Sequence, residues 1–323
     1  MKKLILIFNI CFIFVAFAQK PYKVETSNEI ELQNKSYADN IIAYGTNSVC
    51  MVSSKNSGFM GYKAPKVEDT KFNFFNGSTF KKTVDLIPQD KSAVFMESYN
   101  NNGKLAYIDA LYNNTKKEVE TYYREVSDNG TVTKSTLMNN VVAAQVFLNA
   151  PETIFKTVQS PNSKKILNIV IYKDKEKETE YLLGFDNRFY AVYKQNSMKV
   201  GVIDENGSLL FKKNISINAP EECDRISIED YKINDNGDIF LMVKQFIKGK
   251  KEKVGGEVNY KLYIYAITNN GTSSKKYAIN TKEYFCKRPG LVVANTGNVY
   301  CAGFLSEKVS GNLVGFFTQK IRC

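Results

Sequence analysis

The stretch Ile233-Asn234-Asp235-Asn236-Gly237-Asp238-Ile239-Phe240 decides the fold, because it joins two apolar runs through an Asx-Gly turn. Asn-Gly and Asp-Gly steps tolerate the positive φ that a tight hairpin needs. Similar turns recur at Asn129-Gly130, Asn206-Gly207, Asn270-Gly271 and Thr296-Gly297. Regular recurrence of such turns between apolar runs predicts antiparallel strands in repeated units.

The apolar runs themselves have the character of strands. Ile166–Tyr172, Ile239–Val243 and Leu262–Ile267 are short and rich in β-branched and aromatic residues. Gly, Asn, Asp or Ser bound each of them, and none continues into a long stretch with helical periodicity. The sequence therefore predicts an all-β fold.

The spacing of the turns predicts how the strands are grouped. Turn glycines fall at positions 77, 103, 130, 207, 237, 271 and 297. Most intervals are roughly 26 to 34 residues, the length of one two-stranded hairpin with its connection. The single long interval contains turn-like residues at Ser160-Pro161 and Asp186-Asn187, where the missing turns are expected. Two intervals make one four-stranded unit.

Four-stranded antiparallel units in series are the blades of a β-propeller. The best-defined unit has predicted strands at Ile226–Ile233, Ile239–Phe246, Lys261–Ile267 and Ser274–Ile279. Predicted units begin near Ile41, Ala93, Ile154, Ile226 and Leu291. This count predicts five blades.

The last unit is one strand short, with predicted strands at Leu291–Ala294, Asn298–Phe304 and Val314–Lys320. We expect Lys23–Leu32 to supply the fourth strand and close the ring, which removes exposed strand edges. The strand-like piece Phe189–Tyr193 has no place in this count. Six blades are therefore the alternative.

Two of the turns carry a resemblance. Val293-Ala294-Asn295-Thr296-Gly297-Asn298-Val299-Tyr300-Cys301-Ala302-Gly303-Phe304 and the stretch at 233–240 resemble the D-x-x-G-N-x-Y-x-x-G repeat of secreted bacterial β-propeller proteins, many of them uncharacterised. The resemblance implies a fold and an extracytoplasmic address. It supplies no catalytic residues.

The N-terminus predicts export. Lys2 and Lys3 precede an apolar stretch, Leu4–Phe17, and Val15-Ala16-Phe17-Ala18 ends in the small-x-small pattern that signal peptidase recognises. We expect residues 1–18 to be a cleaved signal peptide and 19–323 a single β-propeller domain, located in the periplasm, on the cell surface or outside the cell. The alternative is an uncleaved anchor helix. No transmembrane segment is expected after cleavage.

The charge does not predict a nucleic-acid partner. Cleavage removes Lys2 and Lys3 and lowers the formal net charge from +11 to +9. The basic residues are nearly all Lys, whereas bidentate recognition of phosphate usually uses Arg. Many of the lysines alternate with acidic residues, as in Lys173–Glu178, which is typical of a solvated loop. We expect a monomer that does not bind nucleic acid.

The cysteines leave disulfide pairing open. The mature chain keeps an odd number of them, without C-x-x-C spacing: Cys50, Cys223, Cys286, Cys301 and Cys323. Cys301 lies in an apolar run and is expected to pack as a small hydrophobic residue. One disulfide among the other four is an alternative that the sequence does not decide.

The search for catalytic chemistry mainly excludes classes. The chain has no His, which excludes Ser-His-Asp and Cys-His nucleophilic sites and His-bearing zinc sites. Phosphate-loop and nucleophile-elbow motifs are absent from the sequence. Asp204-Glu205 and Asp235 with Asp238 could offer oxygen ligands to calcium, but their loops lack the ligand density of a dedicated site. We expect turns there, with no metal and no cofactor.

Two classes of function remain. The first is a non-catalytic binding or scaffold module for a protein or a glycan ligand. The second is a hydrolase or lyase acting on an extracellular polymer through carboxylates such as Glu97 or Asp109. Three or more charged or aromatic side chains converging at one mouth of the channel would favour the enzyme. The chain ends three residues after the last predicted strand, so a fragment of a longer secreted protein is a third alternative.

Overall fold

The computed structural model describes most of the chain from Ser36 onward. The described residues are 36–43, 48–55, 65–142, 153–172, 180–183, 189–192, 195–218, 223, 225–248, 251–281, 283–294 and 296–321. Antiparallel strands dominate them, and one short 3₁₀ turn, Val67–Asp69, precedes a strand. The predicted signal peptide and the predicted closing strand Lys23–Leu32 lie outside the described residues.

The first two sheets have four strands each, in sequence order across the sheet. Blade 1 consists of β1 (Ser36–Ala43), β2 (Ser48–Lys55), β3 (Thr70–Asn76) and β4 (Thr79–Asp85). Blade 2 consists of β5 (Val94–Asn101), β6 (Lys104–Asn113), β7 (Glu118–Val126) and β8 (Val132–Val142).

The remaining sheets follow the same order. Blade 3 consists of β9 (Thr153–Gln159), β10 (Ile166–Tyr172), β13 (Gln195–Ile203) and β14 (Leu209–Asn218). Blade 4 consists of β15 (Arg225–Ile233), β16 (Ile239–Phe246), β19 (Tyr260–Thr268) and β20 (Ser273–Ile279). Blade 5 has three strands, β21 (Phe285–Val293), β22 (Val299–Ser306) and β23 (Leu313–Ile321).

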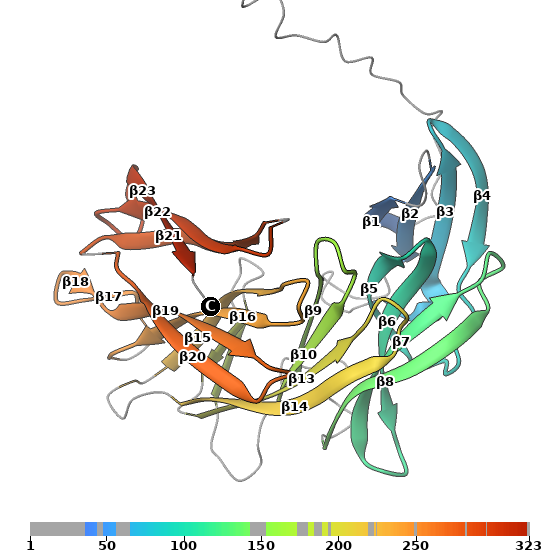
Figure 1. Ribbon diagram of the computed structural model, residues 1–323, viewed down its shortest axis with the longest axis horizontal. Helices are drawn as coiled ribbons and strands as arrows, with labels where there is room; N and C mark the ends of the chain where they lie inside the picture. Colours follow the sequence, from blue (N-terminus) through green and yellow to red (C-terminus); the bar gives the residue numbers. More distant parts are fainter. Residues whose placement is uncertain are drawn as a thin grey trace, which may run out of the picture.

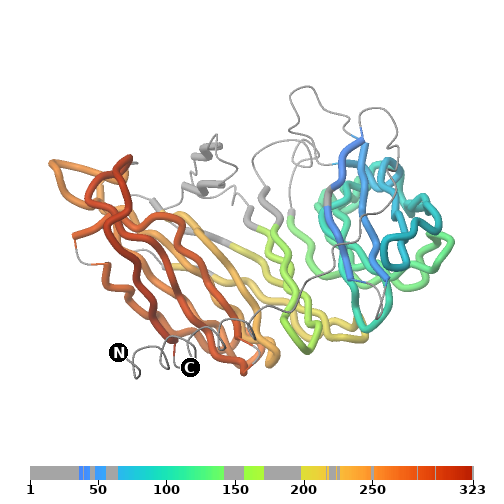
Figure 2. Tube along the Cα trace, turned by 90° about the horizontal axis from the view of Figure 1, so that it is seen from above, coloured from blue at the N-terminus to red at the C-terminus, as the bar shows by residue number. Residues whose placement is uncertain are grey.

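The first strands of successive blades lie next to one another, from β1 to β5, β9, β15 and β21. Sheets that meet along their first strands form a propeller. Figures 1 and 2 show the sheets following an arc, with blade 1 at one end and blade 5 at the other. The prediction of an all-β propeller with four-stranded blades is confirmed, and the described strands form five blades.

The strand-like piece at 189–193 does not begin a sixth blade. It forms β12 (Phe189–Val192), which pairs only with β11 (Glu180–Leu183) among the described strands and lies beside β15. A second small hairpin, β17 (Lys253–Val254) and β18 (Glu257–Val258), occupies the corresponding connection of blade 4. Both hairpins are insertions between the second and third strands of a blade.

The predicted turn glycines all adopt positive φ. They join the first strand to the second, or the third to the fourth, so the alternation of strand direction places these turns at one face of the propeller, here called the turn face. The connections between second and third strands, and between blades, lie at the opposite loop face. Gly207 has an additional constraint, because a Cβ there would lie 2.4 Å from a ring carbon of Tyr123 in the neighbouring blade.

The hydrophobic core is divided among the seams between neighbouring blades. Four clusters of buried residues fill the seams between blades 1 and 2, 2 and 3, 3 and 4, and 4 and 5. Strand β16 is buried along all of its length because neighbouring blades cover both of its faces. Its sequence, Ile-Phe-Leu-Met-Val-Lys-Gln-Phe, accordingly lacks the alternation of a half-exposed strand.

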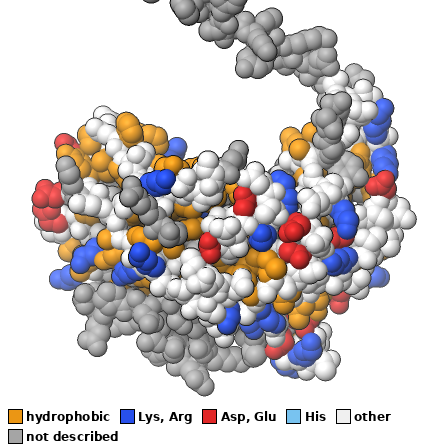
Figure 3. All heavy atoms as spheres, viewed as in Figure 1, with side chains coloured by type: hydrophobic (Ala, Val, Ile, Leu, Met, Phe, Trp, Pro, Cys, Tyr) orange, Lys and Arg blue, Asp and Glu red, His pale blue; other side chains and the backbone are white. Residues whose placement is uncertain are grey.

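Blade 5 exposes apolar side chains. Phe316 is 74% exposed, Val292 is 57% exposed, and Leu313, Val314 and Phe304 are also exposed. Figure 3 shows hydrophobic side chains on the surface over this sheet. The sheet ends at β23, and the described residues supply no fourth strand beyond it.

The described cysteines are buried thiols. Cys50, Cys223 and Cys286 form no disulfide with one another, so that part of the disulfide alternative is wrong, while Cys323, the fourth cysteine of that alternative, lies outside the described residues. Cys301 packs in the seam between blades 4 and 5, as expected of a small hydrophobic residue. Within the described part of the chain no helix is both long and apolar enough to span a bilayer.

Candidate functional site: the ring of inner strands

The first strands of the blades share an irregularity. β1, β5, β15 and β21 each contain a register shift against their second strand, whereas β9 pairs without one. A β-bulge bends a strand and re-aims the side chain that follows it. The residues after the shift, together with Lys156 at the matching point of β9, are here called the ring positions: Asn40, Glu97, Lys156, Asp230 and Gly290.

Side chains at two ring positions link one blade to the next. Asn40 Nδ2 donates to Glu97 Oε1 at 2.8 Å and to the carbonyl oxygen of Ser98 at 3.5 Å. Asp230 Oδ2 accepts the backbone N–H of Leu291 at 2.7 Å. Ser98 and Leu291 both directly follow the ring position of their blade. Asn40 therefore joins blade 1 to blade 2 as a hydrogen-bond donor, and Asp230 joins blade 4 to blade 5 as an acceptor.

The same side chains also fix their own strands. The N–H of Ile41 donates to Asn40 Oδ1 at 2.8 Å, and the N–H of Tyr231 donates to Asp230 Oδ1 at 2.8 Å. A longer contact, 3.3 Å, joins the N–H of Ser98 to Glu97 Oε1. Because the bulge frees backbone groups from the ladder, these bonds satisfy donors that would otherwise lack a partner.

Tyr99 and Tyr231, on blades 2 and 4, both have raised pKa values. Tyr99 is nearly buried and its hydroxyl donates to Thr157 Oγ1 of blade 3. Burial raises the pKa of Tyr99 well above its usual value, and the negative charge of Glu97 adds to that effect. Burial also raises the pKa of Tyr231 to about 12, with further contributions from Asp230 and Glu97. Both phenols stay neutral near pH 7 and can donate hydrogen bonds.

Glu97 thus contributes to the raised pKa of Tyr99 in its own blade and to that of Tyr231 on blade 4. Lys156, half-buried on β9, adds a positive charge at a ring position, and burial lowers its pKa. Charged side chains therefore occupy the ring positions of blades 2, 3 and 4. Convergence of such side chains would favour the enzyme hypothesis.

The two carboxylates named from the sequence are not brought together. Asp109 pairs in register with Phe95, whereas Glu97 pairs with Ile108, the neighbour of Asp109. Adjacent residues of a strand point to opposite faces, so Glu97 and Asp109 lie on opposite faces of blade 2. Asp109 is fully buried at the seam with blade 1 and cannot meet a ligand.

Asp109 instead forms a buried ion pair. Arg124 Nε lies 3.2 and 3.1 Å from its two carboxylate oxygens, and Arg124 Nη1 donates to Gln89 Oε1 at 2.7 Å. The guanidinium also stacks 4.2 Å from the centre of the Tyr122 ring. Burial raises the pKa of Asp109 to about 6, against the opposing effect of Arg124. The pair is a structural element of blade 2.

The acidic residues Asp204 and Asp238 accept hydrogen bonds within their own turns. Asp204 Oδ1 accepts the N–H groups of Asn206 at 2.9 Å and Ser208 at 2.8 Å. Asp238 accepts from Asn234 Nδ2 at 3.0 Å. Asp235 Oδ1 accepts the N–H groups of Asn162 and Ser163 in blade 3. In the described ranges no three His, Cys, Asp or Glu side chains are grouped to hold a metal ion.

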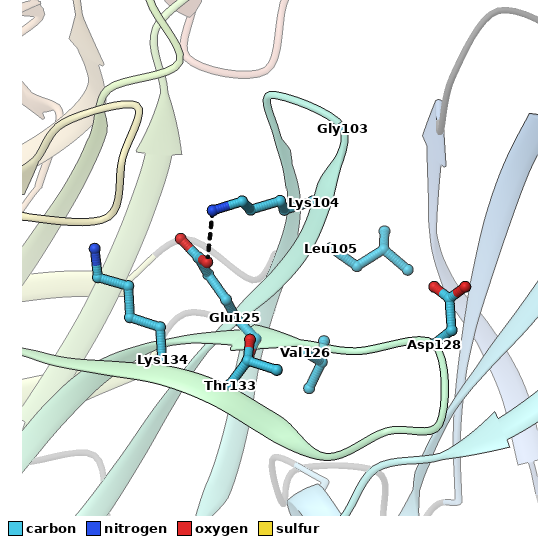
Figure 4. Close-up of a pocket in the computed structure, with 8 residues that line it drawn as sticks. All are labelled: Gly103, Lys104, Leu105, Glu125, Val126, Asp128, Thr133 and Lys134. Carbon is cyan, nitrogen blue, oxygen red and sulfur yellow. Dashed lines mark hydrogen bonds and ion pairs between the residues drawn. The ribbon is translucent and has the colours of Figure 1, made fainter.

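A separate pocket of about 490 Å³ opens at the turn face of blade 2. Figure 4 shows Lys104 pointing toward Glu125, with Lys134 and Asp128 further along the rim. Lys104 Nζ lies 3.1 Å from Glu125 Oε2, and the Glu125 side chain is only 6% exposed. Leu105 and Val126 provide apolar lining.

No family model and no curated protein sequence matches the chain. The fold is similar to that of an α-L-arabinanase from Penicillium chrysogenum, at 10% identity over 89% of this chain and 82% of that chain, with a TM-score of 0.45. It is also similar to the β-propeller domain of the Trilobed protease from Pyrococcus furiosus, at 13% identity over 88% and 81%, with a TM-score of 0.33.

A third similar structure is a xylan β-1,4-xylosidase from Bacillus halodurans, at 12% identity over 87% of this chain and 52% of that chain, with a TM-score of 0.33. At these identities the likeness concerns the fold alone. Because no family model matches, the resemblance of the turn at Gly297 to a secreted propeller repeat stays a prediction.

Sequence reasoning found Glu97 but missed Asn40, Tyr99, Asp230 and Tyr231 as its neighbours. The available signal was positional. In blades 1, 3, 4 and 5 the ring residue forms the fourth strand pair counted from the first turn. Aligning the blades on their turns would have placed Asn40, Lys156, Asp230 and Gly290 at the same position.

Proposed function

We propose that the protein is a non-catalytic binding module that holds a neutral, hydroxyl-rich ligand of the glycan class at the ring positions. The observation that carries the proposal is the hydrogen bond from Asn40, on blade 1, to Glu97, on blade 2, which holds a carboxylate among the first strands of the blades. A carboxylate accepts hydrogen bonds from sugar hydroxyls, a neutral phenol donates to them, and an aromatic ring offers an apolar face. Residues from separated blades can therefore contact one ligand together.

Hydrogen bonding at the ring supports binding over hydrolysis. Glycoside hydrolysis generally uses two carboxyl groups, one of them an acid with a raised pKa. Asp230 is the other carboxylate at a ring position, and it accepts bonds from the N–H groups of Tyr231 and Leu291 and from Lys232 Nζ at 3.0 Å. A carboxylate with both oxygens engaged in this way is a poor proton donor or nucleophile.

The second candidate function is a carboxylate-based hydrolase or lyase acting on an extracellular polymer. The charged side chains of Glu97, Lys156 and Asp230 at ring positions favour it. In that case Glu97 would be the group that contacts the scissile bond.

The proposal includes the setting in which the module acts. We infer that residues 1–18 are removed as a signal peptide and that residues 19–323 act as one monomeric propeller domain outside the cytoplasm. The supporting features are the charged, apolar and small-residue regions of the N-terminus in the correct order. N-terminal sequencing of the exported protein tests this part.

Binding of neutral oligosaccharides to purified 19–323 tests the proposed function. Fragments of xylan, mannan and β-glucan serve as probes in calorimetry. We expect Tyr231→Phe and Glu97→Gln to weaken binding about tenfold, because each removes one hydrogen bond to the ligand. Tyr300→Phe, on blade 5 and 37% exposed, is the matched control and should bind as the unaltered protein does.

Release of reducing ends distinguishes the two candidates. If the unaltered chain releases them and Glu97→Gln does not, the protein is a hydrolase. If none of the probes binds, or if both variants bind like the unaltered chain, the ring is not a glycan site.

A further inference from the structure

The seam between blades 2 and 3 carries lysines on its outer side, away from the ring positions. Strand β8 of blade 2 approaches β13 of blade 3 very closely at Gly201. A Cβ there would lie 2.4 Å from the carbonyl oxygen of Met138. Because Gly201 lacks that atom, β8 can lie directly against β13, and this brings Asn140 to the lysines of blade 3.

Two ammonium groups converge on one amide oxygen at this seam. Lys199 Nζ donates to the backbone oxygen of Asn140 at 2.6 Å and to its Oδ1 at 3.3 Å. Lys212 Nζ donates to the same Oδ1 at 3.0 Å. The two nitrogen atoms are therefore at most about 6 Å apart, a distance at which like charges repel appreciably.

Neutralisation of these two charges by the protein is incomplete. Among the described residues neither Lys199 nor Lys212 forms a salt bridge with a carboxylate. Glu118 lies on the other side of Asn140, where its Oε2 accepts from Asn140 Nδ2 at 3.0 Å. Burial lowers the pKa of Lys199, and Lys212 lowers it further. An anion between the two ammonium groups would relieve this repulsion.

The seam continues toward the turn face with a third lysine. Lys134 of β8 donates to the backbone oxygen of Asn206, and Thr136 Oγ1 donates to the oxygen of Gly207 at 2.6 Å. Lys134 also lines the pocket shown in Figure 4. Figure 3 shows basic side chains gathered over β14 and β8. Positive groups therefore follow the seam from one face of the propeller toward the other.

We propose that this seam binds an anionic polysaccharide, with a sulfate or carboxylate group held between Lys199 and Lys212 and a further one near Lys134. A linear polyanion fits a row of positive groups along one seam. Lysine ammonium groups are compact point charges that suit single sulfate or carboxylate groups. Nucleic acid is the less favoured polyanion, because aromatic rings for base stacking do not accompany the three lysines in the described contacts.

Heparin is the probe for this proposal, with dextran as the neutral comparison, and binding to purified 19–323 is measured at several salt concentrations. The test variant is Lys199→Gln/Lys212→Gln. The control is Lys81→Gln/Lys91→Gln, which removes the same charge from exposed lysines elsewhere. We expect the test variant to bind heparin about tenfold more weakly and the slope of log affinity against log salt to fall by about 2, one for each lost contact.

An equal loss of heparin affinity in both double variants overturns the proposal, because net charge alone would then explain binding. Heparin affinity unchanged in the test variant overturns it equally. Single-stranded DNA that binds more tightly than heparin, and loses affinity in the same variant, identifies nucleic acid as the partner instead.

Asn140→Asp provides a second test variant, in which the hydrogen bond from Asn140 Nδ2 to Glu118 Oε2 is lost. The new carboxylate would lie within reach of both ammonium groups and would replace the external anion. We expect heparin affinity to fall about tenfold, and circular dichroism and thermal unfolding establish that the variant is folded. Heparin affinity maintained in a folded Asn140→Asp protein rejects the proposed site.

Discussion

Asp230 accepts the backbone N–H of Leu291 at 2.7 Å and so fastens the first strand of blade 4 to that of blade 5. Asn40 also joins neighbouring blades, but as a donor: its Nδ2 donates to Glu97 Oε1 at 2.8 Å and to the carbonyl oxygen of Ser98 at 3.5 Å. The polar groups at the centre of the arc therefore hold neighbouring blades together in addition to lining the proposed site.

Removal of the Asp230 side chain should destabilise the protein. Asp230→Ala leaves the N–H of Leu291, a residue only 3% exposed, without its acceptor. We expect a loss of about 1–3 kcal/mol in the free energy of unfolding, measured by urea titration. Glu283→Ala, an exposed acidic residue in the connection to blade 5, is the control and should be close to neutral. Equal stability of the two variants would contradict the assigned link.

Removal of one partner of the buried ion pair Asp109–Arg124 should lower the free energy of unfolding strongly. Asp109→Ala leaves the guanidinium of Arg124 buried without its carboxylate, and we expect a loss of about 3–5 kcal/mol. Replacing both residues with Leu should cost less than the single change. Asp85→Ala breaks the exposed pair with Lys71 and should cost under about 1 kcal/mol. Chemical unfolding of the three variants and the unaltered chain measures these differences.

Asp235 should make stability depend on acid pH. Its carboxylate accepts the N–H groups of Asn162 at 2.9 Å and Ser163 at 2.7 Å across the seam to blade 3. Burial raises its pKa, but these hydrogen bonds outweigh that effect and lower the pKa to about 2.

Because the folded pKa of Asp235 lies below the unfolded value, its contribution is complete above about pH 4 and disappears as the pH falls toward 2. The difference in thermal midpoint between the unaltered chain and Asp235→Asn should therefore shrink from pH 6 to pH 2. A difference that stays constant over that range would show that ionised Asp235 has no role in the seam.

The close approach at Gly201 should not tolerate a side chain. Gly201→Ala places a methyl group against the Met138 carbonyl oxygen, and the required displacement should cost about 1–3 kcal/mol. Gly315→Ala is the control, since a Cβ there meets no atom within 4 Å. It should change stability by less than about 0.5 kcal/mol. Similar unfolding free energies for the two variants would mean that β8 can move away from β13.

The buried thiols should be unreactive in the folded protein. Burial raises the pKa values of Cys50, Cys286 and Cys301 to about 12, so few thiolates are present at pH 8. In a 19–323 chain carrying Cys323→Ser, a thiol reagent should modify these cysteines rapidly in urea and very slowly without it. Rapid modification of the folded protein would show that a seam opens readily.

The Asx-Gly turns allowed most of the fold to be predicted. The strands predicted at 226–233 and 239–246 agree with β15 and β16 to within a residue, because a turn with positive φ limits where both neighbours can begin and end. The insertion β11–β12 was not recognised, since a two-stranded excursion has the same composition as a strand of a blade. Phe189 therefore suggested a sixth unit.

The candidate site was less accessible to prediction. Glu97 was named only as an example, and Asp109 was named with it although the register places the two on opposite faces. A shift of a single position reverses the face of a side chain, and the bulge at Met96 produces such a shift. The bulges depend on how five first strands meet at the centre, which is a tertiary property that the local sequence does not report.

The division of the core among four seams has a consequence for how the chain unfolds. In the described part of the molecule each cluster of buried residues joins a blade only to its sequence neighbours, as in a linear array of repeats. Nearest-neighbour coupling of this kind gives terminal units less support than interior ones. Blade 5, with one covered face, is then the unit that frays first, while blades 3 and 4 keep their amide protons longest.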